Sequence, residues 1–125
     1  MLRKYVSWGA IAMLLAVALG AFGAHGLEDK LKANLMSAYQ TGVQYHIAHA
    51  LGLIVIGLAA GKLGESKWLS RAGLFMLIGI VLFSGSLYVM AVTEITKLGI
   101  ITPFGGVSFM LGWIFLALAA RKSNQ

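Results

Sequence analysis

The sequence predicts an all-α integral membrane protein, a bundle of four transmembrane helices with a short amphipathic helix between the first and second spans. The chain of 125 residues is 59% hydrophobic and only 11% charged, which is far from the balance of a soluble domain of this size. Its apolar residues gather in four long runs without Asp, Glu, Lys or Arg. Such a run must be helical in lipid, because no water is present to satisfy its backbone groups.

The four runs cover residues 5–24, 43–60, 72–92 and 104–120. Each is close to the roughly 20 residues that cross about 30 Å of hydrocarbon. A single membrane domain, residues 1–125, therefore accounts for the chain. The first run also resembles a secretory signal, since Arg3 and Lys4 precede it and small residues end it. Its length favours a transmembrane helix, because the apolar part of a signal is shorter.

The basic residues predict how the chain is oriented in the membrane. With four spans, both termini and the 61–71 loop lie on one side, with seven of the ten Lys and Arg residues. The positive-inside rule then places both termini in the cytoplasm. The seven are Arg3, Lys4, Lys62, Lys67, Arg71, Arg121 and Lys122, and the other three are Lys30, Lys32 and Lys97.

The net charge of +6 therefore reflects topology, and we expect membrane lipid rather than nucleic acid as a partner. The absence of cysteine excludes disulfides and thiolate ligands.

The connection before the second span is amphipathic. Apolar side chains recur every four residues at Leu27, Leu31, Leu35 and Tyr39, beside Glu28, Asp29, Lys30 and Lys32. This pattern predicts a short helix lying on the outer surface. The alternative is that the segment extends the second span outward. The fourth helix is expected to begin at Thr102-Pro103, because a hydroxyl caps free amides and proline suits a first turn.

Small residues predict where the helices touch, because membrane helices associate through close van der Waals contact. We expect packing within one bundle, and the alternative is that a small-residue stripe docks a second copy or a partner membrane protein. The predicted packing positions are Ala12, Ala16, Gly20 and Ala24 in the first helix, Ala48 and Gly52 in the second, and Gly105, Gly106 and Gly112 in the fourth.

Polar residues inside the spans are few, and they predict a site in the outer half of the membrane. With the second span starting at residue 43, His46 and His49 lie roughly 5 and 9 Å below the outer boundary. The expected occupant of an outward-facing pocket is a lipid headgroup or a small solute. The candidate ligand-binding residues are His25, Gln44, Tyr45, His46, His49, Ser84, Ser86, Tyr88 and Ser108.

Other roles for these residues stay open. The histidines could instead hydrogen-bond neighbouring helices in a purely structural or assembly subunit. A metal-binding membrane enzyme would need His25 or Glu94 as a further ligand beside His46 and His49. A serine nucleophile lacks both a carboxylate inside the spans and the Gly-x-Ser-x-Gly elbow. The sequence therefore assigns no catalytic residue, metal or cofactor.

Four segments of the chain resemble a known family. Together they are similar to domain of unknown function 423, also called uncharacterised protein family 0382. The resemblance covers nearly the whole chain and implies a multi-pass protein of the bacterial cytoplasmic membrane, without a catalytic role for any residue. The segments are Gly20–Leu27, Tyr39–His46 with His49, Leu82–Tyr88, and Thr102–Gly106 with Gly112 and Trp113.

Overall fold

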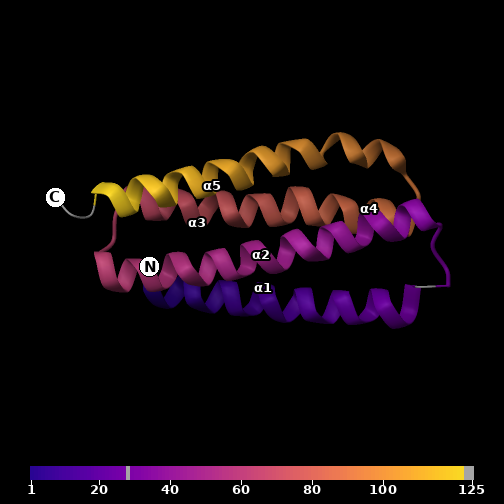
Figure 1. Ribbon diagram of the computed structural model, residues 1–125, viewed down its shortest axis with the longest axis horizontal. Helices are drawn as coiled ribbons and strands as arrows, with labels where there is room; N and C mark the ends of the chain where they lie inside the picture. Colours follow the sequence, from indigo (N-terminus) through magenta and orange to yellow (C-terminus); the bar gives the residue numbers. More distant parts are fainter. Residues whose placement is uncertain (28, 123–125) are drawn as a thin grey trace.

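The computed structural model describes residues 1–27 and 29–122, which form helices joined by short turns and contain no strand. Four helical rods are long and apolar enough to cross a membrane, which confirms the predicted fold class. The start of α1, the end of α5 and the turn before α3 lie at one end of the bundle (Figure 1). The elements are α1 (Leu2–Phe22), η1 (Gly23–Leu27), α2 (Ala33–Leu63), α3 (Lys67–Gly79), η2 (Ile80–Ser84), α4 (Gly85–Thr93), η3 (Thr96–Ile100) and α5 (Thr102–Lys122).

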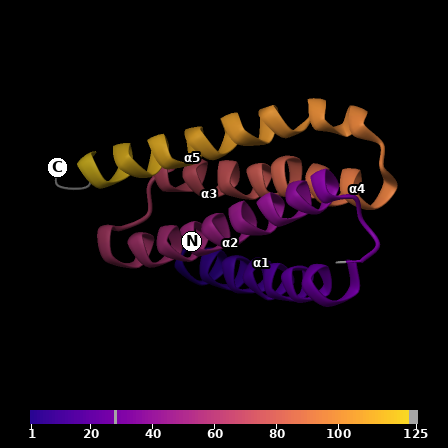
Figure 2. The same cartoon turned by 45° about the vertical axis from the view of Figure 1, so that its right-hand side comes forward.

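The four rods pack in a row, and the first and last rods do not pack against each other to close the bundle. α1 packs along α2, and α5 packs along α3 and the π-helical turn η2, while α2 also packs on α3, η2 and α4 (Figure 2). α2 and the α3–η2–α4 rod therefore lie in the middle of the bundle. α1 and α5 form its two edges, and each leaves a wide apolar face exposed.

Small residues bring α1 and α2 together, as predicted. Ala12 and Ala16 are buried in this contact. Two further glycines, which were not among the predicted positions, bring the backbones close. A Cβ at Gly9 would lie 2.9 Å from the carbonyl oxygen of Ala50, and a Cβ at Gly57 would lie 2.9 Å from the backbone nitrogen of Val6. Ala24 is exposed and does not continue the contact. Its position follows from helix geometry, because a four-residue step turns by about 40° more than a full turn and a stripe at that spacing drifts around the helix.

In α2 and α5 the prediction of packing residues holds in part. Gly52 is buried and lies under Trp113, and Gly105 lies directly on the backbone of Phe83. Ala48 is exposed on the outer face of α2, so its predicted part in packing this bundle is wrong. Two predicted packing glycines of α5 remain. Gly112 packs against Met76 and Ala72, whereas Gly106 makes only ordinary van der Waals contact with the Phe83 ring.

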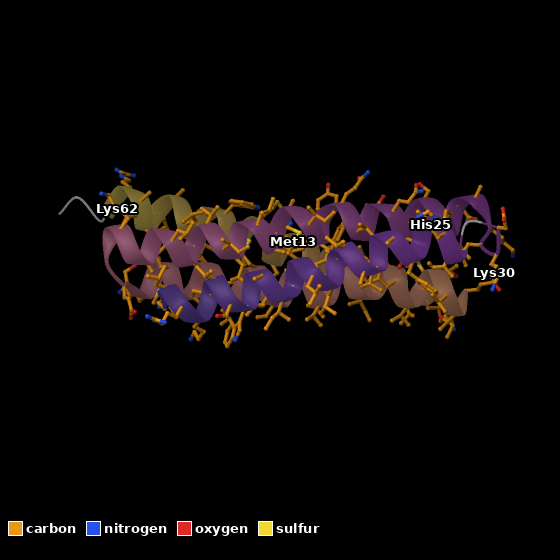
Figure 3. The ribbon with its side chains drawn as sticks, turned by 90° about the horizontal axis from the view of Figure 1, so that it is seen from below. Met13, His25, Lys30 and Lys62 are labelled. Atoms are coloured by element: carbon orange, nitrogen blue, oxygen red, sulfur yellow. The ribbon has the colours of Figure 1, made fainter. Side chains whose placement is uncertain are left out.

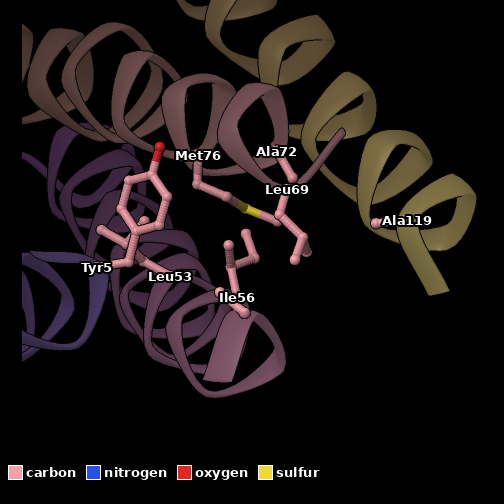
Figure 4. Packing of buried hydrophobic residues seen from close by; sticks show 8 residues of the cluster. Tyr5, Leu53, Ile56, Leu69, Ala72, Met76 and Ala119 are labelled. Carbon is pink, nitrogen blue, oxygen red and sulfur yellow. The ribbon is translucent and has the colours of Figure 1, made fainter. Parts of the chain in front are cut away.

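A buried apolar cluster joins the rods near the end that carries the termini (Figure 4). It contains Tyr5, Leu53, Ile56, Ala60, Leu69, Ala72, Met76 and Ala119. The hydroxyl of Tyr5 donates a hydrogen bond to the Ser70 carbonyl at 3.0 Å. This bond ties the second turn of α1 to the first turns of α3, so these two segments lie at the same level.

The predicted separate amphipathic helix is instead the first part of α2, the alternative that the sequence left open. Leu35 and Tyr39 are buried, and the Tyr39 hydroxyl donates to the Leu19 carbonyl of α1. No proline interrupts the chain between residues 33 and 63, so the helix continues into the second span. Glu28 lies outside the described residues. Lys30 and His25 lie at the end opposite Lys62 (Figure 3).

Candidate functional site

His46 joins three rods near the middle of the bundle. Its side chain is buried, and its Nδ1 lies 2.8 Å from the hydroxyl of Tyr88 on α4. His46 and Ala12 of α1 line the same hollow, so the ring also lies next to α1. The contact at Ala12 is possible because a small residue lets the imidazole lie against the helix. The predicted proximity of His46 and Tyr88 is therefore a feature of the structure.

His49 has both ring nitrogens in hydrogen bonds. Its Nδ1 lies 2.7 Å from the carbonyl oxygen of Tyr45, and its Nε2 lies 3.0 Å from the indole nitrogen of Trp113. A carbonyl only accepts and an indole N–H only donates, so Nδ1 carries the proton and Nε2 accepts. The ring also stacks on Phe109, with centroids 3.5 Å apart. A neutral imidazole held in this way has no free lone pair for a metal or a substrate proton.

The serines bond to the backbone rather than to the histidines. Ser84 is the last residue of the π-helical turn η2, and its hydroxyl donates to the Gly42 carbonyl of α2 at 2.7 Å. Ser108 of α5 donates to the Phe75 carbonyl at 2.7 Å. Ser86 shares a 2.6 Å hydrogen bond with Thr102. Each serine thus joins two rods, and none is paired with a histidine as a nucleophile would be.

The polar layer is closed. His49 lies about 24 Å from the start of α2 at Ala33, near the middle of this 31-residue helix. Every buried polar side-chain atom in residues 1–27 and 29–122 has a hydrogen-bond partner. Within the same residues no three His, Asp or Glu side chains gather as a metal would require. Glu94, the suggested extra ligand, pairs with Lys32 at 3.5 Å.

Three predicted site residues lie outside this layer, since His25, Gln44 and Tyr45 are exposed. His25 is the middle residue of η1, at the end of the bundle opposite Lys62 (Figure 3). The Tyr45 ring packs on Phe83, with centroids 4.5 Å apart, and leaves 44% of the residue exposed.

Gln44 lies in a groove between α1, η1 and α2. The groove has a volume of about 230 Å³ and is lined by Gly20, Gly23, Ala24, Met36, Tyr39, Gln40, Val43 and Gln44. The three small residues come from α1 and η1, and Gln40 and Gln44 come from α2 on the other side of the groove. Neither amide has a hydrogen-bond partner among the residues that the structure describes. The sequence analysis missed Gln40, although its spacing of four from Gln44 places both amides on one helix face.

The four membrane-length rods and their internally bonded polar layer define a small multi-pass membrane protein of helical-bundle type. Residues 19–106 match the family model "Protein of unknown function (DUF423)", and the chain belongs to this family. This confirms the resemblance seen in the sequence.

Named relatives agree with the membrane assignment. The chain is 52% identical to UPF0382 membrane protein YwdK of Bacillus subtilis over 121 residues, which are 97% of this chain and 98% of that protein. It is 46% identical to a UPF0382 membrane protein of Staphylococcus epidermidis over the same shares. A UPF0382 membrane protein of Haemophilus influenzae is 41% identical over 100% of this chain and 99% of its own length. No solved structure matches the chain.

Proposed function

We propose that this protein binds the polar head of a membrane lipid, or a small solute with the same hydrogen-bonding oxygens, in the groove beside Gln40 and Gln44. The observation that carries the proposal is a pair of exposed glutamines that line this groove and whose amides lack a hydrogen-bond partner among the described residues. A carboxamide both donates and accepts hydrogen bonds. Both residues are exposed, so their amides are free to bond an external partner.

The depth of the groove supports a lipid headgroup. α2 is about 46 Å long, whereas the hydrocarbon layer is about 30 Å thick. The first turns of α2 therefore extend into the headgroup region, and Gln40 lies only about 10 Å from Ala33. Phosphate and ester oxygens of lipids lie at this level, where an amide N–H could donate to them.

We further propose that the protein resides in the bacterial cytoplasmic membrane with both termini in the cytoplasm. The described basic residues support this orientation, because the end with the termini carries Arg3, Lys4, Lys62, Lys67, Arg71 and Arg121. Under this orientation the groove of Gln40 and Gln44 faces the outer leaflet.

Lipid retention tests the groove directly. The full chain is purified in detergent, and bound phosphatidylethanolamine is measured by native mass spectrometry for the wild type and for Gln40→Leu/Gln44→Leu. We expect the double variant to lose most of the bound lipid. Asn34→Leu, an exposed amide of α2 outside the groove, is the matched control and should retain it. Equal retention by all three proteins would remove the proposal.

A second experiment distinguishes a membrane lipid from a small solute that carries the same oxygens. Glycerol phosphate, which has the headgroup oxygens but no acyl chains, is titrated under the same conditions. Binding of the lipid alone identifies a membrane lipid, whereas binding of both identifies a solute site. In either case Ala24→Trp, which places bulk on the small-residue wall, should reduce binding.

A structural or assembly subunit is the second candidate function. Ala48 lies exposed one turn beyond Gln44, so two amides and a small residue share one face of α2. Glutamines hydrogen-bond across membrane helices, and small residues allow close approach. If Gln40→Leu/Gln44→Leu converts a dimer into a monomer without changing lipid retention, this second function replaces the first.

A further inference from the structure

A second groove, which exposes no polar surface, runs between α1 and the α3–η2 rod near the middle of the bundle. Its volume is about 310 Å³, and its walls include Trp8, Ile11 and Leu15 of α1 with Leu77, Ile80 and Val81 of the α3–η2 rod. An adjoining hollow of about 330 Å³ shares Leu77 and Val81 and continues along the exposed face of α3. Neither hollow exposes a polar surface, so both suit a hydrocarbon chain.

Three cations lie between this groove and the end of the bundle that carries the start of α1. Lys4 precedes Trp8 by one turn of α1, and its Nζ lies 5.1 Å from the centroid of the Trp8 ring. On α3, the Nζ of Lys67 and the Cζ of Arg71 lie 5.5 and 5.2 Å from the Trp68 ring. The hydrogen bond from Tyr5 to Ser70 fixes Lys4 and Arg71 at one level, since each is next in sequence to a bonded residue.

These cations lack anionic partners among the described residues. The one carboxylate of this end that forms an ion pair there, Glu65, binds the N-terminal amine at 2.9 Å. The other recorded ion pair, Lys32 with Glu94, lies at the opposite end of the bundle. Lys4, Lys67 and Arg71 therefore present uncompensated positive charge beside interfacial tryptophans, an arrangement that attracts anionic lipid headgroups.

The distance from the cations to the far end of the groove matches one leaflet. Along α1, Leu15 lies about 16 Å beyond Lys4, and along the α3–η2 rod Val81 lies about 15 Å beyond Arg71. Half of a hydrocarbon layer is about 15 Å thick. With the cations at the interface, the groove would therefore reach His46 and the π-helical turn η2 at mid-membrane.

We infer that this groove binds one anionic phospholipid of the leaflet next to the termini, with its phosphate at Lys4 and Arg71 and an acyl chain against Trp8, Ile11 and Leu77. Charge selects the headgroup, because a guanidinium and an ammonium both bond phosphate oxygens. The apolar walls select the chain. This site is separate from the groove of Gln40 and Gln44 and involves none of its residues.

The test compares two lipids with identical acyl chains. Phosphatidylglycerol or phosphatidylcholine is added to the full chain in detergent, and bound lipid is counted by native mass spectrometry. We expect phosphatidylglycerol to bind more tightly, and Lys4→Gln and Arg71→Gln to weaken it by about five-fold each. The control pair Lys62→Gln/Arg121→Gln removes the same charge from the same end but away from the groove, and should bind as the wild type does.

Groove-filling variants test the acyl chain. Ile11→Trp adds bulk inside the groove, whereas Leu14→Trp adds it to another exposed face of α1. We expect only Ile11→Trp to lower phosphatidylglycerol binding. The inference is overturned if the lipids bind equally, if the control pair loses as much affinity as Lys4→Gln/Arg71→Gln, or if Ile11→Trp has no effect. Loss of a dimer in Ile11→Trp would also overturn it, since a second copy would then fill the groove.

Discussion

The indole N–H of Trp113 on α5 donates to Nε2 of His49 on α2 across 3.0 Å. The backbones of these two helices come close at few points, because α5 lies mainly along α3 and η2. The bond therefore connects an edge helix to the centre of the bundle, in surroundings where an unpaired donor would be costly. It also sets the histidine tautomer, since Nε2 must accept while Nδ1 bonds the Tyr45 carbonyl.

We predict that His49 and Trp113 are energetically coupled. His49→Leu leaves the indole N–H and the Tyr45 carbonyl without their imidazole partner and should lower the free energy of unfolding by about 1–3 kcal/mol. Trp113→Phe should cost less, because the ring remains. Their double-mutant cycle, measured by denaturation in mixed micelles, should give a coupling of about 0.5–1.7 kcal/mol. A coupling of zero would mean that the bond contributes nothing to stability.

Neighbouring glycines of α5 should respond in opposite directions to alanine. A Cβ at Gly105 would overlap the backbone of Phe83 in η2, whereas a Cβ at Gly106 would lie 3.8 Å from the Phe83 ring. Gly105→Ala should therefore destabilise the bundle by about 1–3 kcal/mol. Gly106→Ala should be neutral or stabilise it by up to about 1 kcal/mol, because alanine is the better helix former. The same denaturation measurement checks both, and equal effects would contradict the close contact.

Hydropathy predicted the fold because each span has no charged residue and must satisfy its backbone internally. The length of α2 was underestimated, since the residues before Val43 are amphipathic and give no hydrocarbon signal. The burial of Tyr39 against Leu19 of α1 makes this segment part of the helix. Pattern alone cannot show such a tertiary contact. The exposure of Ala48 has a similar origin, because spacing does not say which side of a helix meets its neighbour.

The sequence predicted which residues form the polar layer, but it did not predict their hydrogen-bond partners. Proximity of His46 and Tyr88 follows from two helices of opposite direction, whereas the partner of His49 is a tryptophan that hydropathy treats as interfacial. The π-helical turn η2 has no marker in the sequence, yet it positions Ser84 to reach the Gly42 carbonyl. Gln40 could have been found from its spacing with Gln44.

Enlarging a buried alanine and an exposed alanine should have different effects on stability. Ala16 has 0% of its surface exposed in the contact of α1 with α2, whereas Ala48 is exposed on α2. Ala16→Leu should force the helices apart and cost about 1–3 kcal/mol or more. Ala48→Leu should leave the thermal unfolding temperature of the purified chain unchanged, because lipid or detergent accommodates the larger side chain. A destabilised but monomeric Ala48→Leu would contradict the placement of Ala48.

The orientation of the bundle can be tested with single cysteines, since the sequence contains none. Lys30 and Lys62 lie at opposite ends (Figure 3) and both are exposed. Lys30→Cys and Lys62→Cys each leave the basic residues biased toward the end that carries the termini, so neither substitution should reverse the protein. In intact bacterial cells, a membrane-impermeant maleimide should label Lys30→Cys at once and Lys62→Cys only after the membrane is permeabilised. The reverse pattern would place the termini outside, and would also move the Gln40 and Gln44 groove to the cytoplasmic leaflet. Labelling of both positions in intact cells would indicate dual insertion, which the bias in basic residues argues against.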